Sequence, residues 1–164
     1  MKYVKQILPY IIIIFVVIMI RTFLVTPVRV KGSSMVPTLN SGEIMILNKW
    51  DRNFKRFSIV VLNYNNTKLI KRVIGVPGEK IAYKGNKLYI NGKYVKEPFK
   101  HKNTDDFMLE ELGYNEIPKG YYLVLGDNRT NSTDSRMIGL VSEKDILGTT
   151  NFAIFPFSKF GTVK

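Results

Sequence analysis

The sequence predicts a mostly β protein that begins with one apolar helix. Two observations lead to this fold class. The first is an unbroken apolar run near the amino terminus, from Tyr10 to Ile20. The second is a series of short stretches of β-branched and aromatic residues after it, separated by Gly, Pro and Asn. A length of 164 residues leaves room for one domain behind that helix.

The apolar run is predicted to be a membrane anchor. It is flanked by the basic residues Lys2, Lys5 and Arg21. If the side chains of Lys5 and Arg21 extend toward lipid head groups, Val4 to Val25 forms a helix about 33 Å long, which spans a bilayer. The alternative is a cleaved secretory signal peptide, but no pair of small residues follows the run. We therefore predict a transmembrane anchor at residues 6–25 behind a short cytoplasmic end at residues 1–5.

Charge does not decide the orientation of this anchor, because the numbers of basic residues on its two sides are nearly equal. We therefore predict the orientation from the long domain that follows the anchor. Long domains are translocated largely regardless of their charge. We therefore expect a single-pass protein of the plasma membrane, with a cytoplasmic amino terminus and residues 26–164 outside the cytoplasm. Four bulky residues could dip into the membrane interface or pack in the core, namely Trp50, Phe152, Phe155 and Phe157.

Eight strands are predicted after the anchor. Their expected ranges are Val28 to Lys31, Ile44 to Lys49, Ile59 to Tyr64, Leu69 to Ile74, Lys80 to Tyr83, Lys87 to Ile90, Tyr121 to Leu125 and Gly148 to Phe155. The pairs Gly85-Asn86 and Asn91-Gly92 are typical of hairpin turns, so residues 80–118 are predicted to form a small inserted ribbon and loop. Within it, Glu97 to Pro118 is expected to be a surface excursion, with a weakly helical stretch at Asp106 to Leu112.

Composition excludes several chemistries. The chain has no cysteine, so it holds no disulfide, catalytic thiol or cysteine-bound zinc. Its single histidine, His101, lies in a basic polar stretch, which argues against a Ser-His-Asp triad and against most metal sites. We predict neither a metal nor a cofactor. The net charge of +12 admits nucleic acid, anionic lipid or acidic proteins as partners. Because the lysines are dispersed, we expect anionic membrane lipids rather than nucleic acid.

A serine without a histidine partner needs another base, and lysine can serve if burial keeps its amine neutral. Ser34 lies beside a proline turn, and Lys71 lies in an apolar strand pattern. Alternation puts Lys71 on one face of that strand and Arg72 on the other, and it does not say which face is buried. From residues 126–136, composition alone predicts equally well a surface loop or a hydrogen-bonded network that orients a catalytic group.

Three motifs in this order resemble the type I signal peptidases, which are membrane-anchored serine proteases, and in particular the shorter Gram-positive type. The segment Ser34 to Leu39, Ser-Met-Val-Pro-Thr-Leu, is similar to the nucleophile motif of that family. The segment Lys71 to Glu79 is similar to its lysine motif. Residues Gly126 to Arg129, followed by Ser132, Asp134, Ser135 and Arg136, are similar to its carboxy-terminal motif.

The resemblance implies an all-β catalytic domain with a Ser/Lys dyad and no cofactor. Ser34 would attack the substrate carbonyl and its N–H would bind the oxyanion, with Lys71 as the base. Ser132 would orient the Lys71 amine, and Asp134 with Arg136 would form a structural ion pair. The substrates would be pre-proteins that carry a signal peptide, cleaved after small residues in an Ala-x-Ala-like pattern. We also expect a monomer.

The resemblance in the nucleophile motif implies site roles for three further residues. The sequence also departs from the family pattern at two places. Gly32 would lie near the oxyanion hole, and Met35 and Pro37 would line the substrate pocket. Some members carry a serine at the position of Gly32, so the second oxyanion donor is unidentified. A Gly-Asp pair usually opens the strand after the nucleophile motif, whereas Phe57-Ser58 stands here.

Two other functions remain open from sequence. One is a membrane-tethered basic β domain that binds or assembles without catalysis, although such a protein would be free to lose Ser34 or Lys71. The other is a Ser/Lys autoprotease that cleaves its own chain, but no Ala-Gly or similar cleavage sequence is found in a flexible segment.

Overall fold

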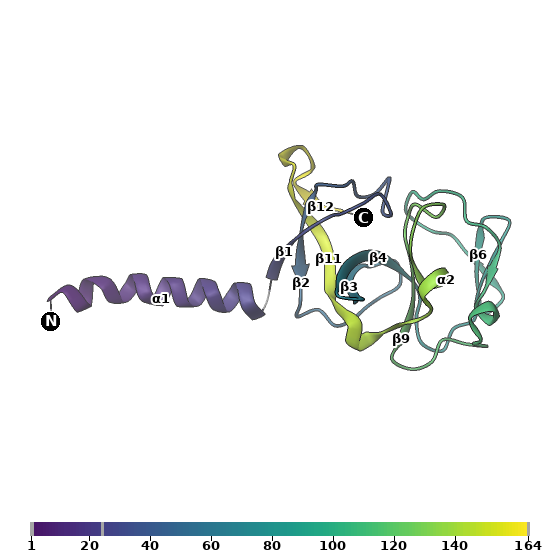
Figure 1. Ribbon diagram of the computed structural model, residues 1–164, viewed down its shortest axis with the longest axis horizontal. Helices are drawn as coiled ribbons and strands as arrows, with labels where there is room; N and C mark the ends of the chain where they lie inside the picture. The colour runs from purple at the N-terminus through teal and green to yellow at the C-terminus, as the bar shows by residue number, and fades with distance from the viewer. Residues whose placement is uncertain (1, 24, 164) are drawn as a thin grey trace.

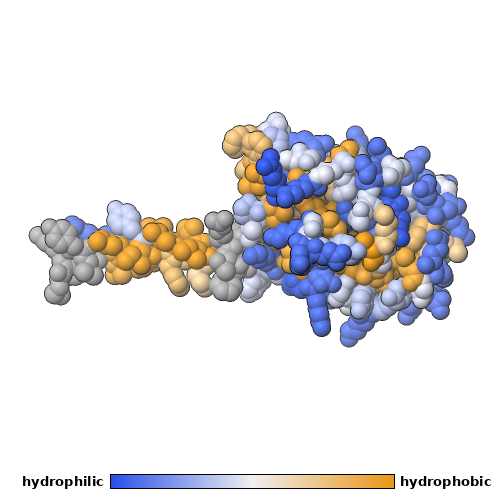
Figure 2. Space-filling view, in the orientation of Figure 1, coloured by the Kyte–Doolittle hydropathy of each residue, from blue (hydrophilic) through white to orange (hydrophobic). Residues whose placement is uncertain are grey.

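The computed structural model describes residues 2–23 and 25–163. Helix α1 (Lys2–Phe23) projects from a β domain that contains all the other elements, as Figure 1 shows. Large apolar side chains along α1 are exposed, among them Ile11, Ile14 and Phe15. Figure 2 shows this helix as an apolar rod. Within residues 2–23 and 25–163, no helix has both the length and the apolar character needed to cross a membrane.

The main sheet is antiparallel and contains eight strands. Along the sheet they follow the order β1 (Val25–Arg29), β2 (Ile44–Asn48), β11 (Ile146–Phe155), β3 (Ile59–Tyr64), β4 (Thr67–Gly75), β9 (Tyr121–Leu125) and β10 (Val141–Ser142), and β12 (Gly161–Thr162) also pairs with β11. Strands β3 and β4 form a hairpin from Ile59↔Arg72 to Tyr64↔Thr67. Strand β9 pairs with β4 only from Arg72 onward, so the first residues of β4 have one open edge.

A second, smaller sheet follows β4. Its order is β7 (Lys93–Val95), β6 (Lys87–Ile90), β5 (Ile81–Lys84) and β8 (Phe107–Met108). The hairpin turns predicted at Gly85-Asn86 and Asn91-Gly92 are confirmed, because β5 pairs with β6 and β6 with β7. The remaining elements are one short helix, α2 (Ser135–Ile138), and three 3₁₀ turns, η1 (Leu109–Leu112), η2 (Glu143–Asp145) and η3 (Phe157–Lys159).

The predicted strands match the observed ones to within a few residues, and the mostly β fold class is confirmed. Two expectations about the insert need correction. The stretch Asp106 to Leu112 is helical only in part, because strand β8 (Phe107–Met108) precedes a 3₁₀ helix at Leu109–Leu112. Residues Glu97 to Pro118 are not merely a surface excursion, because Phe107, Leu109 and Ile117 pack in the same core cluster as Ile74 and Leu123 of the main sheet. Apolar residues spaced irregularly through a polar stretch hid this contact.

Strand β4 contributes residues to three core clusters, one of them through Ile74, and is buried on both faces from Ile70 to Gly75. One cluster includes Ile70 and joins β1 to the nucleophile segment through Met35 and Leu39. Another includes Val73. A strand covered on both sides carries no alternation of polar and apolar residues, which explains why the sequence pattern did not assign the faces of Lys71 and Arg72.

The turn before β3 keeps its shape with an unusual residue. Phe57, at the place where a Gly-Asp pair usually stands, has a φ of 67°, in the region that favours glycine. Its N–H donates to the carbonyl of Val73 (2.7 Å), and its ring packs edge-on against Phe99. These contacts hold a backbone conformation that a non-glycine residue rarely adopts.

Candidate active site

Ser34 lies in the loop between β1 and β2, on an irregular segment that is fixed by its backbone. The carbonyl of Ser34 accepts from the Asn128 N–H (2.9 Å), and the carbonyl of Ser33 accepts from the Asn128 side chain (3.1 Å). The side chain of Met35 attaches the same segment to the core, because it is 1% exposed and belongs to the core cluster of β1 and β2. Two residues far apart in the sequence, Met35 and Asn128, therefore set the position of Ser34.

The hydroxyl of Ser34 meets a buried amine. Lys71 Nζ lies 2.7 Å from Ser34 Oγ, although Lys71 is on strand β4 and is only 2% exposed. Burial lowers the pKa of Lys71 from 10.5 to about 8, because desolvation disfavours the ammonium more than the nearby charges of Asp134 and Asp127 favour it. Among the described residues Lys71 makes no ion pair. An amine in this state can accept a proton near neutral pH.

Arg72, the next residue, is buried with a full set of partners. Its guanidinium donates twice to the Asp127 carboxylate, at 2.9 and 2.7 Å, and once to the carbonyl of Phe57 (2.8 Å). The hydroxyl of Thr38 donates to the same carboxylate (2.5 Å). The Phe99 ring lies 4.0 Å from the guanidinium carbon. This pair joins the lysine strand to the loop after β9.

Residues 126–136 contain a buried network, because residues 126–129, 134 and 135 are buried, whereas Thr130, Asn131 and Thr133 are exposed. Asp134 is fully buried, and its carboxylate accepts from Arg136 Nε (2.9 Å) and from the Gly126 N–H (3.0 Å). The predicted contact between Asp134 and Arg136 is thus present as an ion pair. Arg136 also donates to the carbonyl of Arg129 (2.7 Å), which closes the loop.

Gly126 lies where this loop meets Ser34. A Cβ atom at Gly126 would collide with the Ser34 carbonyl oxygen and with the Ser132 side chain, whose Cβ would lie 2.7 Å away. The absence of a side chain at position 126 therefore allows Ser132 and Ser34 to approach the same point. The Ser132 hydroxyl is buried and has no hydrogen-bond partner among the described residues, so the bond expected between Ser132 and Lys71 is not formed here.

The other predicted site residues lie at varying distances from a substrate. Gly32 is exposed and has a φ of 80°, with open space where a Cβ would lie. Pro37 is exposed, whereas Met35 is a core residue. His101, which the sequence places in a basic polar stretch, lies half-buried between Glu97 and the carbonyl of Lys102. In the part of the chain that the structure describes, no group of acidic or histidine side chains could hold a metal ion.

A groove lies between β1 and the start of β4, and neither Ser34 nor Lys71 is among the residues that line it. It is lined by residues of β1 and its extension, Pro27, Val28, Arg29 and Lys31, and by Asn66, Thr67 and Lys68 at the start of β4, around a volume of about 400 Å³. Strand β1 ends the sheet, and this part of β4 has no β9 beside it, so both walls present open strand edges. An extended peptide could add its backbone to such edges.

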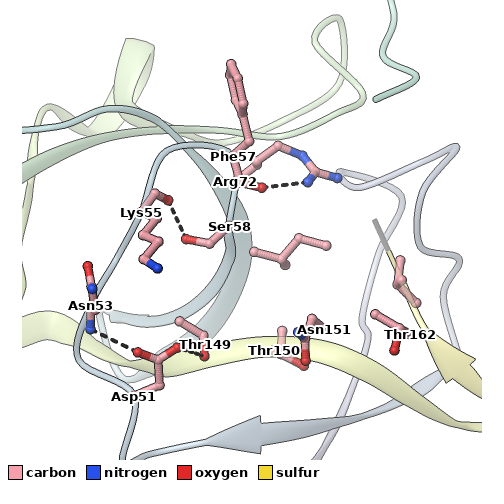
Figure 3. Close-up of a pocket in the computed structure, with 12 residues that line it drawn as sticks. Asp51, Asn53, Lys55, Phe57, Ser58, Arg72, Thr149, Thr150, Asn151 and Thr162 are labelled. Carbon is pink, nitrogen blue, oxygen red and sulfur yellow. Dashed lines mark hydrogen bonds between the residues drawn. The ribbon is translucent and has the colours of Figure 1, made fainter. Parts of the chain in front are cut away.

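A second, polar cavity of about 350 Å³ lies elsewhere and includes neither Ser34 nor Lys71. Figure 3 shows it between the turn before β3 and strand β11, with Lys55 and Thr149 on opposite sides and the Arg72 guanidinium bonded to the Phe57 carbonyl. Its hydroxyl groups and the Asp51 carboxylate bond mainly within the protein, as Thr149 does to Asp51 (3.0 Å). This cavity has no nucleophile beside a base.

In this mostly β domain a serine hydroxyl lies 2.7 Å from a buried lysine amine. A hydroxyl within hydrogen-bond reach of a candidate base is the arrangement found in the class of serine hydrolases. Comparison with known proteins specifies the family. The model of the family described as "Signal peptidase, peptidase S26" matches residues 1–155. The chain therefore belongs to the signal peptidase family S26, and it is a serine endopeptidase.

Individual relatives agree with this assignment. The chain is 42% identical to signal peptidase I T of Bacillus subtilis (strain 168), over 94% of this chain and 86% of the relative. It is 44% identical to signal peptidase IB of Staphylococcus aureus (strain COL), over 95% and 93%. A crystal structure of a signal peptidase I from Enterococcus faecalis V583 is similar with a TM-score of 0.54 and 38% identity, over 58% of this chain and 94% of that chain.

Sequence reasoning missed several residues that shape the site. Asp127 and Thr38 were part of motifs but received no role. They contact each other across 89 positions of the sequence, and Asp127 also binds Arg72, 55 positions away. Glu97 and Arg129, which form a buried ion pair, were also unassigned. One signal in the sequence could have pointed to these residues: acidic residues cluster in the polar segment 97–118, although the chain as a whole is strongly basic.

Proposed function

We propose that this peptidase removes signal peptides from exported pre-proteins by means of a Ser34/Lys71 dyad, cleaving after small residues in an Ala-x-Ala-like pattern. The observation that carries the proposal is the 2.7 Å contact between Lys71 Nζ and Ser34 Oγ, made by an amine whose pKa is lowered to about 8 by burial. A nucleophile needs a base within hydrogen-bond reach, and Lys71 meets that requirement.

The reaction follows from these atoms. Ser34 Oγ attacks the substrate carbonyl carbon while its proton passes to Lys71 Nζ, and the resulting ammonium gives that proton to the leaving amine. Water then attacks the acyl-enzyme ester, losing its proton to Lys71, and Ser34 regains its proton as the acid product leaves. The Ser34 N–H bonds no other described residue, which supports its role as an oxyanion donor. The second donor, expected near Gly32, is not assigned.

Ser132 is proposed to orient the Lys71 amine. The support is indirect: the Ser132 hydroxyl is buried without a described partner, and it approaches the Gly126 position that the Ser34 carbonyl also approaches. A buried unpaired hydroxyl is costly, and an ammonium formed on Lys71 during the reaction would offer it a donor after a small side-chain movement. The ion pair of Asp134 and Arg136 keeps the surrounding loop in place.

The substrate is proposed to bind as an extended strand in the groove between β1 and the start of β4. The support is that each wall is close in sequence to one member of the dyad: Lys31 lies three residues before Ser34, and Lys68 lies three residues before Lys71. Backbone hydrogen bonds to the open edges would hold the chain in register, and alternate side chains would face the enzyme. Pro37, near the nucleophile, is proposed to contact the substrate, with Met35 shaping the site from the core.

Membrane attachment is proposed for α1. Its apolar side chains are exposed, and exposed apolar surface of this extent needs a cover. A lipid bilayer provides that cover, with the amino terminus on the cytoplasmic side and the β domain of a monomer outside, at the surface where signal peptides emerge. The hairpin between β11 and β12 adds two exposed aromatic side chains, Phe155 and Phe157. The net charge of +12 supports attraction to anionic lipids.

The test is cleavage of a model precursor with an Ala-x-Ala site by detergent-solubilised full-length protein. We expect Ser34→Ala and Lys71→Ala to abolish cleavage, while the neighbouring Ser33→Ala and the exposed Lys80→Ala retain it. Cleavage by Lys71→Ala at the wild-type rate would remove the dyad from consideration. Sedimentation with anionic vesicles, with and without residues 2–23, tests membrane attachment separately.

A further inference from the structure

The loop that supports the nucleophile is held at three successive residues. The carbonyl of Gly126 accepts from Arg129 Nε (3.0 Å), the carbonyl of Asp127 accepts from the Lys102 N–H (3.0 Å), and the N–H of Asn128 donates to the Ser34 carbonyl (2.9 Å). The last of these bonds ends on the nucleophile residue itself. A displacement of residues 126–128 would therefore move Ser34 relative to Lys71.

Two of these three bonds depend on the insert. Arg129 is fully buried, and beyond Gly126 its guanidinium donates to the Tyr83 hydroxyl (3.0 Å), the Thr104 hydroxyl (2.6 Å) and Glu97 Oε1 (2.5 Å). Tyr83 is on β5 of the second sheet, while Glu97 and Thr104 belong to the segment that follows β7. The second sheet and this segment thus hold the loop in place through Arg129.

Glu97 is the central residue of this hydrogen-bond network. Its carboxylate is 4% exposed; one oxygen accepts from Arg129 and from the Tyr83 hydroxyl (2.9 Å), and the other lies 3.1 Å from His101 Nε2. Burial alone would raise the pKa of Glu97, but hydrogen bonds from His101 and Arg129 bring it down to about 2. Glu97 therefore stays ionised throughout the pH range in which the enzyme can work.

His101 faces an acceptor at each ring nitrogen. Nε2 faces Glu97, and Nδ1 lies 2.8 Å from the carbonyl of Lys102, the residue whose N–H holds Asp127. A neutral imidazole has one N–H, so only the imidazolium can donate to both acceptors. The other groups that face the ring are Arg129, whose charge opposes protonation, and the Phe99 ring at 5.6 Å.

We propose that Glu97 and His101 are positioning residues for the peptidase reaction, holding loop 126–128 against Ser34 through Arg129 and the backbone of Lys102. The proposal rests on the Ser34/Lys71 chemistry above. Neither residue touches the reacting atoms; each acts through the loop. In this proposal the insert helps to position the nucleophile and is not merely an addition to the fold.

Protonation of His101 makes this hydrogen-bond network dependent on pH. The hydrogen bond to Glu97 raises the pKa of His101 above its ordinary value of 6.5, in spite of its partial burial. The imidazolium is thus present at acid pH, below the ordinary pKa of 6.5, and is lost as pH rises through the raised pKa. Lys71 changes in the opposite sense, because it becomes a competent base as pH rises. The two effects can be separated, since only one of them involves His101.

The experiment compares the rate of precursor cleavage as a function of pH for the full-length wild type, His101→Gln and Glu97→Gln. The matched control is Glu116→Gln, at an exposed glutamate of the same insert. We expect kcat of His101→Gln to fall about tenfold at acid pH, where the wild type carries the imidazolium, as a displaced nucleophile would cause. The ratio of wild-type to variant rate should shrink toward one at alkaline pH, where the wild type has lost the imidazolium. Glu97→Gln should lose about tenfold or more at every pH.

A merely structural role would lower the rate of His101→Gln by the same factor at every pH, and that result would overturn the proposal. So would wild-type kinetics in both variants. If Glu97→Gln fails to fold by circular dichroism, the profile of His101→Gln, whose side chain is 15% exposed, decides alone. Ser34→Ala in the same assay separates this outcome from failure of the dyad itself, because an active Ser34→Ala would disprove the proposed chemistry whatever Glu97 and His101 do.

Discussion

The two faces of strand β4 each carry one buried cation. Lys71 and Arg72 are adjacent, and each residue is 2% exposed. On the Arg72 face the charge meets the Asp127 carboxylate, the Phe57 carbonyl and the Phe99 ring. On the Lys71 face the amine bonds the Ser34 hydroxyl and no carboxylate.

This difference separates a structural cation from a reactive one. Burial penalises a charge in both cases, but a bidentate carboxylate compensates the guanidinium, and nothing equivalent compensates the amine. The pKa of Lys71 accordingly falls to about 8. The partner of a buried cation, rather than burial alone, decides whether it can act as a base. Four substitutions would break or sharpen this contrast.

The largest effect is expected from Lys71→Arg, which makes the two faces alike. An arginine cannot lose its proton in a protein, so Ser34 would have no base. We expect kcat/KM for a model precursor to fall by about 10³-fold or more. Lys71→Met provides the uncharged comparison. It should be equally inactive, yet more stable to urea than the wild type below pH 8, where burial of the ammonium opposes folding. Substantial cleavage by Lys71→Arg would contradict a lysine base.

The second effect concerns the other face. Asp127→Asn would leave the Arg72 guanidinium buried without a counter-charge, and such a loss costs about 3–5 kcal/mol. Urea unfolding measures this change, with Asp105→Asn, at an exposed aspartate of the insert, as the control. Equal stability of the two variants would mean that Arg72 does not need its partner.

A third effect is expected at Gly126, which adjoins the partners of both buried cations, Ser34 and Asp127. It precedes Asp127, and its missing side chain leaves room for the Ser34 carbonyl and for Ser132. Gly126→Ala should displace Ser34 and lower kcat by about 100-fold, with a smaller effect on KM. Steady-state kinetics on folded protein test this. An unchanged kcat would show that the loop yields without disturbing Ser34.

The smallest effect is a shift in pH dependence. The rate should rise with pH through the pKa of Lys71, near 8. Asp134 raises that pKa by its negative charge, so Asp134→Asn should move the rising limb to lower pH. The exposed Asp145→Asn should leave it in place. A limb that stays fixed, or moves to higher pH, would exclude this electrostatic contribution.

Much of the fold could be predicted from the sequence, because turn residues and β-branched stretches mark the hairpins of both sheets. The faces of β4 could not, since both are covered and alternation disappears. Motif resemblance, not periodicity, selected Lys71 over other lysines, and its role as a base stays a prediction. The structure does bring Lys71 to Ser34 across 37 positions of the sequence.

The remaining contacts depend on approaches that no local pattern encodes. Glu97 and Arg129 are 32 positions apart, and each lies in a polar stretch typical of a loop. Phe57 occupies a backbone conformation for which glycine is the usual choice, so its turn could not be inferred from residue type. Both features follow from packing of the insert against the main sheet.

The groove between β1 and β4 has a consequence for the design of inhibitors. Three of its seven lining residues are cationic, namely Arg29, Lys31 and Lys68, and none is acidic. A compound that satisfies the two open strand edges with an extended amide backbone could place a carboxylate against these cations. Its selectivity over other serine hydrolases would come from this charged end, some distance from the reactive hydroxyl, and would not require a more electrophilic reactive group.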